Sequence, residues 1–285
     1  MPSSQFNQWQ IGIAFHRVAA WPCQKNQVEE ERTLFDLSKH VALVTGGNAG
    51  LGLGMARGLA KAGASIAIWG RNAERNAEAR AELERMGVLA AAFECDVTDP
   101  AAVDRAMAAT LETFGRLDSC FANAGGSGAR GPLLALPPEA WEQTMHLNFH
   151  SVVSTFRVAA AQFVAQGTGG RLVVTSSIAA LLGIPGGGGY SASKAAVTGL
   201  VRALAIELGA AGITVNAILP GFIETEMSLD TPQAFRDAPL RRTPSGQIGT
   251  LADVEGIAVF LASQESRLMT GQSLVLDGAH TIFPL

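Results

Sequence analysis

The stretch VALVTGGNAGLGLG, residues 41–54, joins a short apolar run to a glycine-rich turn and then to a helical segment. The run 41–45 has the length and composition of a strand that is buried on both faces. Gly46, Gly50 and Gly52 follow it with the spacing T-G-x-x-x-G-x-G. Glycines at such a turn let the backbone approach a phosphate, and the start of the helix presents free N–H groups to it. The stretch therefore predicts a strand–turn–helix unit that holds the pyrophosphate of a dinucleotide.

The spacing of these glycines differs from the common G-x-G-x-x-G, because Met55 stands where its last glycine would be. A glycine-rich turn between a strand and a helix is weak evidence by itself. A tight turn that only packs against the sheet therefore stays open as an alternative at this point.

Outward from this unit the same alternation continues along the chain. Apolar runs end in glycine, asparagine, aspartate or serine, and helical segments such as 72–87 and 137–164 separate them. With 41–45, the runs are 65–69, 89–95, 117–122, 171–177, 213–218 and 273–277. This pattern is typical of βαβ units and predicts an α/β fold. We expect one doubly wound, Rossmann-type domain with a seven-stranded parallel sheet and helices on both faces, rather than the eight even units of a TIM barrel.

The chain divides into an N-terminal extension, residues 1–36, and one domain, residues 37–285. The extension has its own composition, including an acidic run at 29–31, and carries no motif with a mechanism. We expect it to be variable or partly disordered. Within the domain, residues 225–250 contain three prolines and no clear periodicity. An irregular segment of this length is typical of a binding loop, so we interpret it as the substrate loop.

The overall composition argues against several classes of function. The 285 residues carry 21 Lys and Arg against 25 Asp and Glu, which speaks against nucleic acids or an anionic membrane as partners. No apolar run reaches the roughly 20 residues that a membrane span needs. The three cysteines are widely spaced and form no metal-ligand pattern. We therefore expect free thiols, no metal site and a cytoplasmic location.

The end of the second predicted strand bears on the choice of cofactor. A carboxylate there would accept hydrogen bonds from the adenosine 2′-hydroxyl of NAD and repel a 2′-phosphate. This chain has Gly70 and then Arg71 instead, and a guanidinium can bind a phosphate. The sequence thus favours NADP(H) over NAD(H), with an ordinary solvated arginine at the start of a helix as the alternative.

The segment YSASK, residues 190–194, pairs a phenol with an ammonium group. Tyr190 is the only tyrosine of the chain, and Lys194 is one of four lysines. On a helix, a spacing of four residues puts both side chains on one face. A neighbouring lysine cation favours the phenolate form of a tyrosine. Such a tyrosine can exchange a proton with a substrate hydroxyl or carbonyl group while a hydride moves to or from the cofactor.

Further polar residues fall at the carboxyl ends of predicted strands, where open α/β sheets bind ligands. Ser177 ends such a run, thirteen residues before Tyr190, and its hydroxyl can hold the same substrate oxygen. The segment NAG, residues 123–125, follows another run. Asn148 lies inside a helical segment, where an amide is mildly disfavoured, and this indicates a task for it.

From about Leu37 to Gly278 the chain resembles the short-chain dehydrogenase/reductase family. The resemblance rests on elements that follow in order: TGGNAGLG (45–52), CDVTD (95–99), NAG (123–125), Asn148, Ser177, YSASK (190–194) and PGFIET (220–225). It implies an NAD(P)-dependent alcohol dehydrogenase or carbonyl reductase, which interconverts a secondary alcohol and a ketone by hydride transfer.

The resemblance also implies a role for each matching residue. Tyr190 is expected to be the general acid/base, and Lys194 is expected to favour its phenolate and to bind the nicotinamide ribose. Ser177 would orient the substrate oxygen, and Asn148 would hold a water that relays protons to Lys194. The expected cofactor-binding residues are Gly46, Asn48, Gly50, Leu51, Gly52, Arg71, Asp96, Val97, Asn123, Ala124, Gly125, Tyr190, Lys194, Pro220, Gly221, Ile223 and Thr225. Of these, Asp96 is expected at the adenine and Thr225 at the nicotinamide carboxamide, with a plain turn residue as the alternative for Asp96.

The chain departs from the family pattern at positions that affect its cofactor and partners. Many NADP(H)-using relatives carry a basic residue where this chain has Ala49, which weighs against NADP(H). The family's acyl-carrier-protein reductases usually carry arginines where this chain has Thr168 and Ala211. Docking of an acidic carrier protein is therefore not expected.

The expected walls of the substrate pocket are residues 126–131, 178–189 and the loop 225–250. The first two walls are small and apolar, and Arg130 is their only charged residue. We expect a small-molecule carbonyl or alcohol substrate of modest size, with a polyol or sugar acid included. Arg130 is a candidate for binding a carboxylate, with an exposed loop arginine as the alternative.

Other functions stay open at this point. The first is an NAD-dependent polyol or sugar-acid dehydrogenase. The others are a cofactor-binding sensor without redox chemistry, and an epimerase or lyase on the same fold. The long helical segments 137–164 and 188–211 are rich in alanine and aliphatic residues, as in the homotetramers and homodimers of the family. We therefore expect a homotetramer or homodimer.

Overall fold

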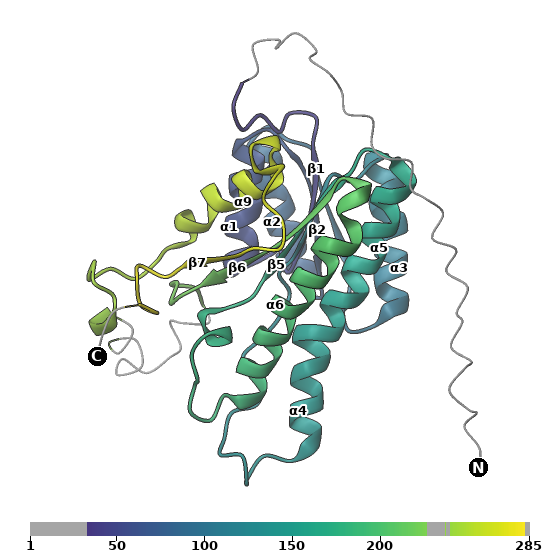
Figure 1. Cartoon of the computed structure of the whole chain (residues 1–285). Coiled ribbons are helices and arrows are strands. Elements are labelled where there is room, and N and C mark those ends of the chain that lie inside the picture. Colours follow the sequence, from purple (N-terminus) through teal and green to yellow (C-terminus); the bar gives the residue numbers. More distant parts are fainter. Residues whose placement is uncertain (1–32, 227–236, 238–239, 283–285) are drawn as a thin grey trace, which may run out of the picture.

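Seven parallel strands form the centre of the protein. The computed structural model describes residues 33–226, 237 and 240–282. In this part of the chain the strands form one sheet in the order β3-β2-β1-β4-β5-β6-β7, with every neighbouring pair parallel (Figure 1). They are β1 (Val41–Thr45), β2 (Ser65–Gly70), β3 (Ala90–Glu94), β4 (Ser119–Ala122), β5 (Gly170–Thr175), β6 (Ile213–Pro220) and β7 (Ser273–Leu276). The predicted doubly wound parallel sheet is confirmed, with strand ends shifted by up to two residues.

The strand order reverses between β1 and β4. From β1 the chain steps outward to β2 and β3, and it then returns to place β4 on the other side of β1. Loops that follow β1 and β4 therefore leave in opposite directions and open a crevice at the carboxyl ends of the strands. The glycine-rich turn and the segment NAG both lie at this crevice, because they follow β1 and β4.

Helices cover both faces of the sheet. In Figure 1, α1, α2 and α9 lie on one side, and α3, α5 and α6 lie on the other. The helices are α1 (Gly50–Lys61), α2 (Ala73–Arg85), α3 (Pro100–Phe114), α4 (Pro138–Met145), α5 (Ser151–Gln166), α6 (Gly188–Leu208) and α9 (Glu255–Ala262). Short 3₁₀ turns occur at Ile178–Ala180, Gly209–Ala211, Leu251–Val254 and Gln264–Ser266.

The alternation of side chains along β1 explains the two covered faces. Val41 and Leu43 belong to a core cluster with buried residues of α3, α5 and α6. Ala42 and Val44 belong to a second cluster with residues of α1, α2 and α9. Successive residues of a strand point to opposite faces, so a continuous apolar run is what a sheet between two helical layers requires.

The helical segment predicted over 137–164 is three pieces in line. Helix α4 passes through a π-helical turn, His146–His150, into α5. Asn148 lies at the centre of this turn and is buried. A π turn widens the helix by one residue, is rare, and often marks a functional site. The sequence periodicity predicted the helix but not this turn.

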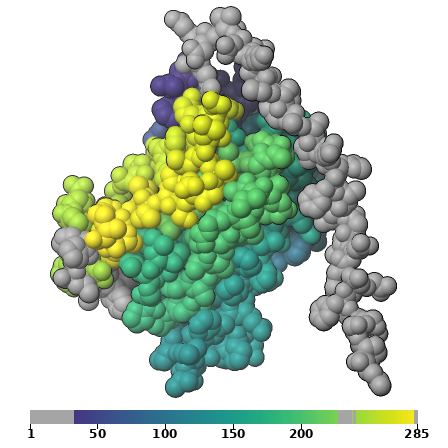
Figure 2. Space-filling model, viewed as in Figure 1, coloured from purple at the N-terminus to yellow at the C-terminus, as the bar shows by residue number. Residues whose placement is uncertain are grey.

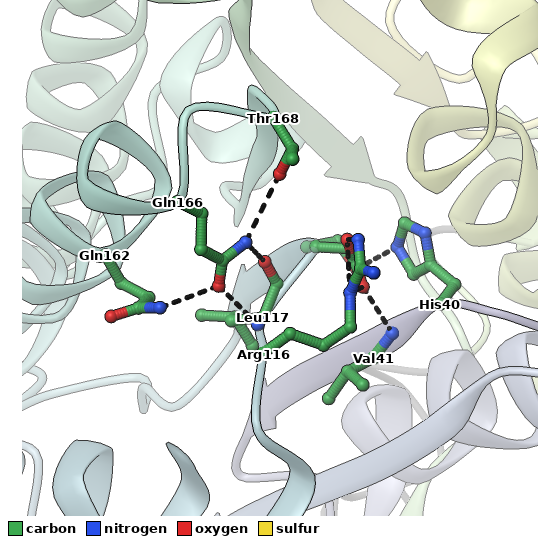
Figure 3. A network of polar contacts seen from close by, with 9 residues as sticks. His40, Val41, Arg116, Leu117, Gln162, Gln166 and Thr168 are labelled. Atoms are coloured by element: carbon green, nitrogen blue, oxygen red, sulfur yellow. Dashed lines mark hydrogen bonds and ion pairs between the residues drawn. The ribbon is translucent and has the colours of Figure 1, made fainter.

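A polar network holds the amino-terminal ends of β1 and β4, at the edge of the sheet opposite the crevice (Figure 3). The Gln166 amide accepts from the N–H of Leu117 and donates to its carbonyl, both at 2.8 Å. Asp118 accepts from the N–H of Val41 at 2.9 Å and pairs with Arg116. His40 Nε2 lies 3.0 Å from the hydroxyl of Ser119. This network joins the end of α5 to the starts of two central strands.

Two sequence predictions lie partly outside the described residues. The extension 1–36 is described only from residue 33, and the loop 225–250 is not described over 227–236 and 238–239. The boundaries of both remain predictions. None of the described helices has the length and apolar character that crossing a membrane requires.

Candidate functional site

The turn after β1 forms a cradle that only glycine allows. Gly46 and Gly50 have φ angles of 63° and 51°, which side chains rarely adopt. A Cβ at Gly52 would lie 2.2 Å from the carbonyl oxygen of Gly46. Ala49 stands at the N-cap of α1 and makes no side-chain capping bond, so no cap side chain covers the N–H groups of the first turn. The turn therefore fits the pyrophosphate of a dinucleotide, while Leu51 lies half-buried on α1.

The end of β2 has no room for a side chain while Asn48 and Asn76 keep their positions. A Cβ at Gly70 would lie 2.4 Å from both Asn48 Nδ2 and Asn76 Oδ1. Asn48 Nδ2 donates to Asn76 Oδ1 at 2.7 Å, and Asn76 Nδ2 donates to the carbonyl of Gly70 at 2.8 Å. These two amides occupy the space in which an acidic side chain at position 70 would begin. Arg71, the next residue, is exposed to solvent.

Asn76 is a site residue that sequence reasoning missed. It lies on α2 and is buried against the ends of β2 and β3. Its signal in the sequence was an amide on the face of α2 that Ala79 and Leu83 also occupy. Without the fold, nothing showed that Asn48 of the glycine turn would be its partner.

Asp96 follows β3 and closes its own turn. Its Oδ1 accepts from the N–H of Thr98 at 2.9 Å and from the Thr98 hydroxyl at 2.7 Å. These hydrogen bonds lower the pKa of Asp96, and the nearby Arg71 cation lowers it further. Val97 is buried beside it. Asp96 therefore stabilises its own turn, as the alternative interpretation expected. The positive charge of Arg71 lies close enough to act on the Asp96 carboxylate.

Thr45, Asn123 and Thr175 fasten the central strands at the crevice. The hydroxyl of Thr45 accepts from the N–H groups of Asn123 and Ala124, both at 3.0 Å. Asn123 Nδ2 donates to the carbonyl of Thr45 at 3.1 Å, and Asn123 Oδ1 accepts from the Thr175 hydroxyl at 3.0 Å. The ends of β1, β4 and β5 therefore form one unit. Both threonines were missed, because strand neighbours must be known before such bonds can be expected.

Tyr190 and Lys194 lie in the first two turns of α6. Lys194 is 6% exposed, and its Nζ donates to the carbonyl of Thr175 at 2.8 Å. The same Nζ lies 5.8 Å from the centre of the Tyr190 ring. Burial lowers the pKa of Lys194 to about 8. At neutral pH the lysine therefore remains mostly a cation, held beside the phenol by the end of β5.

Asn148 connects the turn after β4 with α6. Its Oδ1 accepts from the N–H of Gly126 at 3.0 Å, and its Nδ2 donates to the carbonyl of Gly126 at 2.9 Å. Nδ2 also lies 3.2 Å from the hydroxyl of Ser193, which in turn donates to the carbonyl of Tyr190 at 2.7 Å. A Cβ at Gly125 would lie 2.9 Å from Asn148 Oδ1 and 3.5 Å from Lys194 Nζ. The side chains of Asn148 and Lys194 thus both lie next to Gly125.

Ser177 lies at the same edge of the sheet, two residues beyond the end of β5. Its hydroxyl oxygen accepts from the N–H of Ala179 at 3.1 Å and so caps the 3₁₀ turn Ile178–Ala180. The N–H of Ala179 takes one of its lone pairs, which leaves its own O–H proton available for donation. Ser177 is partly exposed.

The segment PGFIET extends β6 toward the glycine turn. Pro220 pairs with Leu276 of β7, and the N–H of Gly221 donates to the carbonyl of Leu276 at 2.9 Å. Ile223 is buried and pairs with Gly249. A Cβ at Gly50 would lie 3.8 Å from the methyl group of Thr225. This contact brings the predicted nicotinamide side of the crevice to the predicted pyrophosphate turn, whereas Arg130 is exposed on its loop.

The chain is similar to known enzymes over most of its length. A family model described as enoyl-(acyl carrier protein) reductase matches residues 46–281. Gluconate 5-dehydrogenase of Gluconobacter oxydans (strain 621H) is 36% identical over 251 residues, which are 87% of this chain and 97% of that protein. L-Rhamnose 1-dehydrogenase (NAD(P)(+)) of Sphingomonas sp. (strain SKA58) is 38% identical over 245 residues, with 85% and 96% covered.

The fold is similar to that of solved structures with related sequences. A short-chain type dehydrogenase/reductase from Mycobacterium marinum superposes with a TM-score of 0.84 at 33% identity, covering 87% of this chain and 98% of that one. The family named on the sequence motifs is thus confirmed by an independent match of sequence and of fold. The chain belongs to the short-chain dehydrogenase/reductase family and is an oxidoreductase that acts on alcohols and carbonyl compounds.

Proposed function

We propose that this protein interconverts a secondary alcohol and a ketone, with Tyr190 as general acid/base and NADP(H) as the favoured cofactor. The observation that carries the proposal is the position of Lys194, whose buried ammonium group lies 5.8 Å from the Tyr190 ring. A cation is expensive to bury. Its burial beside the only tyrosine of the chain is best explained by a use in proton transfer.

The crevice offers a place for each part of the dinucleotide. Gly46, Gly50 and Gly52 would hold the pyrophosphate, and Asn48 and Leu51 belong to the same turn. Asp96 and Val97 would face the adenine, and Lys194 the nicotinamide ribose. The remaining candidates at the nicotinamide end are Asn123, Ala124, Gly125, Pro220, Gly221, Ile223 and Thr225. When bound, the nicotinamide supplies or accepts the hydride.

The proton path belongs to side chains of the protein. Tyr190 exchanges the proton of the substrate oxygen, and the Lys194 cation stabilises the negative charge that this leaves on the phenol oxygen. Ser177 holds the same substrate oxygen with the O–H proton that its bond from Ala179 leaves available. Asn148 fixes Gly126 and Ser193, and we propose that its π turn also holds the water that supplies Lys194.

The end of β2 supports NADP(H). Position 70 carries no acidic side chain, so the adenosine 2′-position of a bound dinucleotide would meet Arg71 rather than a carboxylate. A guanidinium binds a phosphate strongly. Ala49 argues against NADP(H), because many NADP(H)-using relatives carry a basic residue at this position.

An NAD-dependent polyol or sugar-acid dehydrogenase is the second candidate. The names of two similar proteins favour it, gluconate 5-dehydrogenase and L-rhamnose 1-dehydrogenase (NAD(P)(+)). Both candidates share the chemistry of Tyr190 and differ in cofactor and substrate.

A paired titration with NADPH and NADH, followed by nicotinamide fluorescence, tests the cofactor proposal without a known substrate. Tighter binding of NADPH supports NADP(H) and a reductase of ketones. Tighter binding of NADH contradicts it and favours the polyol or sugar-acid dehydrogenase. A panel of ketones, polyols and sugar acids then tests the substrate class, and net consumption of reduced cofactor excludes an epimerase or lyase.

We further propose a homotetramer or homodimer in the cytoplasm. Helix α6 lies beside the C-terminal segment on one face of the molecule (Figure 2), and a Cβ at Gly271 would lie 3.4 Å from the Cβ of Ala205. Ile206, Leu268 and Ile282 are each more than 80% exposed. Such apolar exposure favours burial against a second copy. The free thiols of Cys95 and Cys120 are in keeping with a reducing compartment.

A further inference from the structure

Two arginines flank the start of α2, at the adenosine end of the crevice. Arg71 directly follows β2, and Arg75 lies in the first turn of α2, where its N–H donates to the capping side chain of Asn72 at 2.9 Å. Both side chains reach solvent. The N-terminus of a helix carries the positive end of its dipole, so cations there are disfavoured unless an anion joins them.

The anion that Arg75 meets in the structure comes from the other side of the crevice. Its Nη2 lies 3.1 Å from Oε2 of Glu226, with the two side chains 52% and 73% exposed. Glu226 directly follows Thr225, the residue whose methyl group lies near Gly50 of the glycine turn. The ion pair therefore joins the start of α2 to the segment after β6 at the predicted cofactor site.

We propose that Arg75 is a second determinant of cofactor choice and that Glu226 competes with the 2′-phosphate of NADP(H) for it. This inference rests on the proposed preference for NADP(H). An exposed ion pair such as Arg75–Glu226 is weak, because solvent and salt screen it. A phosphate monoester carries about −1.5 to −2 charges at neutral pH and binds a guanidinium through two parallel hydrogen bonds. The phosphate therefore displaces the carboxylate, whereas a ribose 2′-hydroxyl does not.

Because of this competition, Glu226 selectively weakens the binding of nucleotides that carry a 2′-phosphate. Its carboxylate lowers the affinity for a 2′-phosphate, both by occupying Arg75 and by repelling the phosphate charge. It opposes a nucleotide that lacks this group much less, because such a nucleotide brings no negative charge to Arg75. A neutral residue at position 226 thus increases the preference for NADP(H), and a neutral residue at position 75 decreases it.

The test is calorimetric titration of the full chain at low salt with two fragments that differ only in the 2′-phosphate, adenosine 2′,5′-bisphosphate and 5′-AMP. We expect Arg75→Gln to weaken binding of the 2′,5′-bisphosphate about tenfold and Glu226→Gln to strengthen it about threefold. Binding of 5′-AMP should change less than about twofold in either variant, and the effect of Glu226→Gln should shrink at about 0.5 M KCl. The matched control is Arg80→Gln, which removes a cation further along α2 that is paired with Glu84. It should leave both fragments unchanged.

The outcomes separate this inference from the proposed function. If Arg75→Gln and Glu226→Gln change both fragments equally, or change neither, the competition for Arg75 is overturned whatever the wild-type protein prefers. If the wild-type protein binds the two fragments equally and Arg71→Gln has no effect, the proposed NADP(H) preference is overturned instead.

Discussion

Tyr190 is the residue on which the proposed chemistry depends most. Its backbone is fixed by Ser193, and the Lys194 ammonium lies near its ring. Tyr190→Phe removes the hydroxyl and keeps the ring. We expect kcat to fall by at least about a hundredfold, because general acid–base catalysis contributes roughly 10²–10⁴-fold.

Affinity for NADPH separates a lost proton path from a damaged site in that experiment. It should stay within about twofold of the wild-type value, because the substitution removes only the hydroxyl that the proposed proton path needs. Wild-type turnover in Tyr190→Phe would contradict the role of this residue.

We expect the buried Lys194 cation to lower the stability of the folded protein, although the proposed function needs it. Burial lowers its pKa from 10.5 to about 8, so the native state is penalised for holding the charge. We expect Lys194→Met to raise the free energy of unfolding at pH 7 by on the order of 1–2 kcal/mol, after loss of the bond to Thr175. The same variant should be inactive.

The sign of its pH dependence follows from linkage. Below about pH 8 both states of the wild-type protein carry the proton, and the penalty is complete. Between about pH 8 and 10.5 the native state loses the proton first, so the wild-type protein gains stability relative to the variant. Urea denaturation at pH 7 and 9.5 measures how much more stable Lys194→Met is than the wild-type protein at each pH. A stability difference that grows with pH would refute this account.

Single residues show what sequence reasoning can reach. The glycine turn, Ser177 and YSASK could be named as candidates because their proposed chemistry depends on local spacing. Thr45, Thr175 and Asn76 were not found, because their bonds join strands and helices that are distant in sequence. The Tyr190–Lys194 pair was predictable from one helix, whereas the carbonyl that holds Lys194 comes from β5.

At the scale of elements, glycines of α1 decide how closely α9 approaches. A Cβ at Gly58 would lie 2.7 Å from Cα of Glu255, which is backbone and has little room to move. We expect Gly58→Ala to lower the free energy of unfolding by roughly 1–3 kcal/mol, because the two helices must separate.

A second helical glycine provides the control. Gly199 in the interior of α6 has no neighbour among the described residues within 4 Å of its Cβ position. Gly199→Ala should be neutral or raise stability by up to about 1 kcal/mol, since alanine is the better helix former. Thermal unfolding of both variants checks the prediction, and equal effects would show that contact with α9 does not matter.

Sequence periodicity predicted which elements exist better than how they end or bend. The seven strands follow from apolar runs. Five of them are buried almost throughout between the two helical layers, whereas β3 and β7 at the edges of the sheet are only partly buried. The π turn between α4 and α5 was not predictable, because one extra residue in a helix leaves the apolar pattern nearly intact on each side.

At the scale of the whole molecule, the network at the amino-terminal edge should make stability depend on pH. Burial lowers the pKa of His40 to about 4, the Arg171 and Arg116 charges lower it as well, and Asp118 opposes them. The native state therefore favours the neutral ring, while the unfolded chain takes up the proton below about pH 6.5. The contribution of the neutral His40 ring to the free energy of unfolding should be fully present above about pH 6.5. It should fall by on the order of 2 kcal/mol as the pH drops toward 4.

Replacement of His40 isolates this contribution. His40→Gln keeps an amide that can reach Ser119 and cannot take up a proton in this range. The variant should lose less stability than the wild-type protein between pH 7 and 4.5, as measured by urea denaturation. Parallel curves for the two proteins would assign the acid sensitivity to carboxylates elsewhere.

The π turn at His146–His150 has a consequence for which changes of length this helix accepts. It holds one residue more than a regular helix would, so removing any one residue there would restore an unbroken α-helical ladder. The helices on both sides would keep nearly their present rotation, because the wide turn already absorbs the extra residue, and Phe156 and Phe163 would stay in the core. Asn148 lies in the turn itself, so its two hydrogen bonds to Gly126 are what the deletion would break. The extra residue therefore serves the position of one amide and not the packing of the helix that carries it.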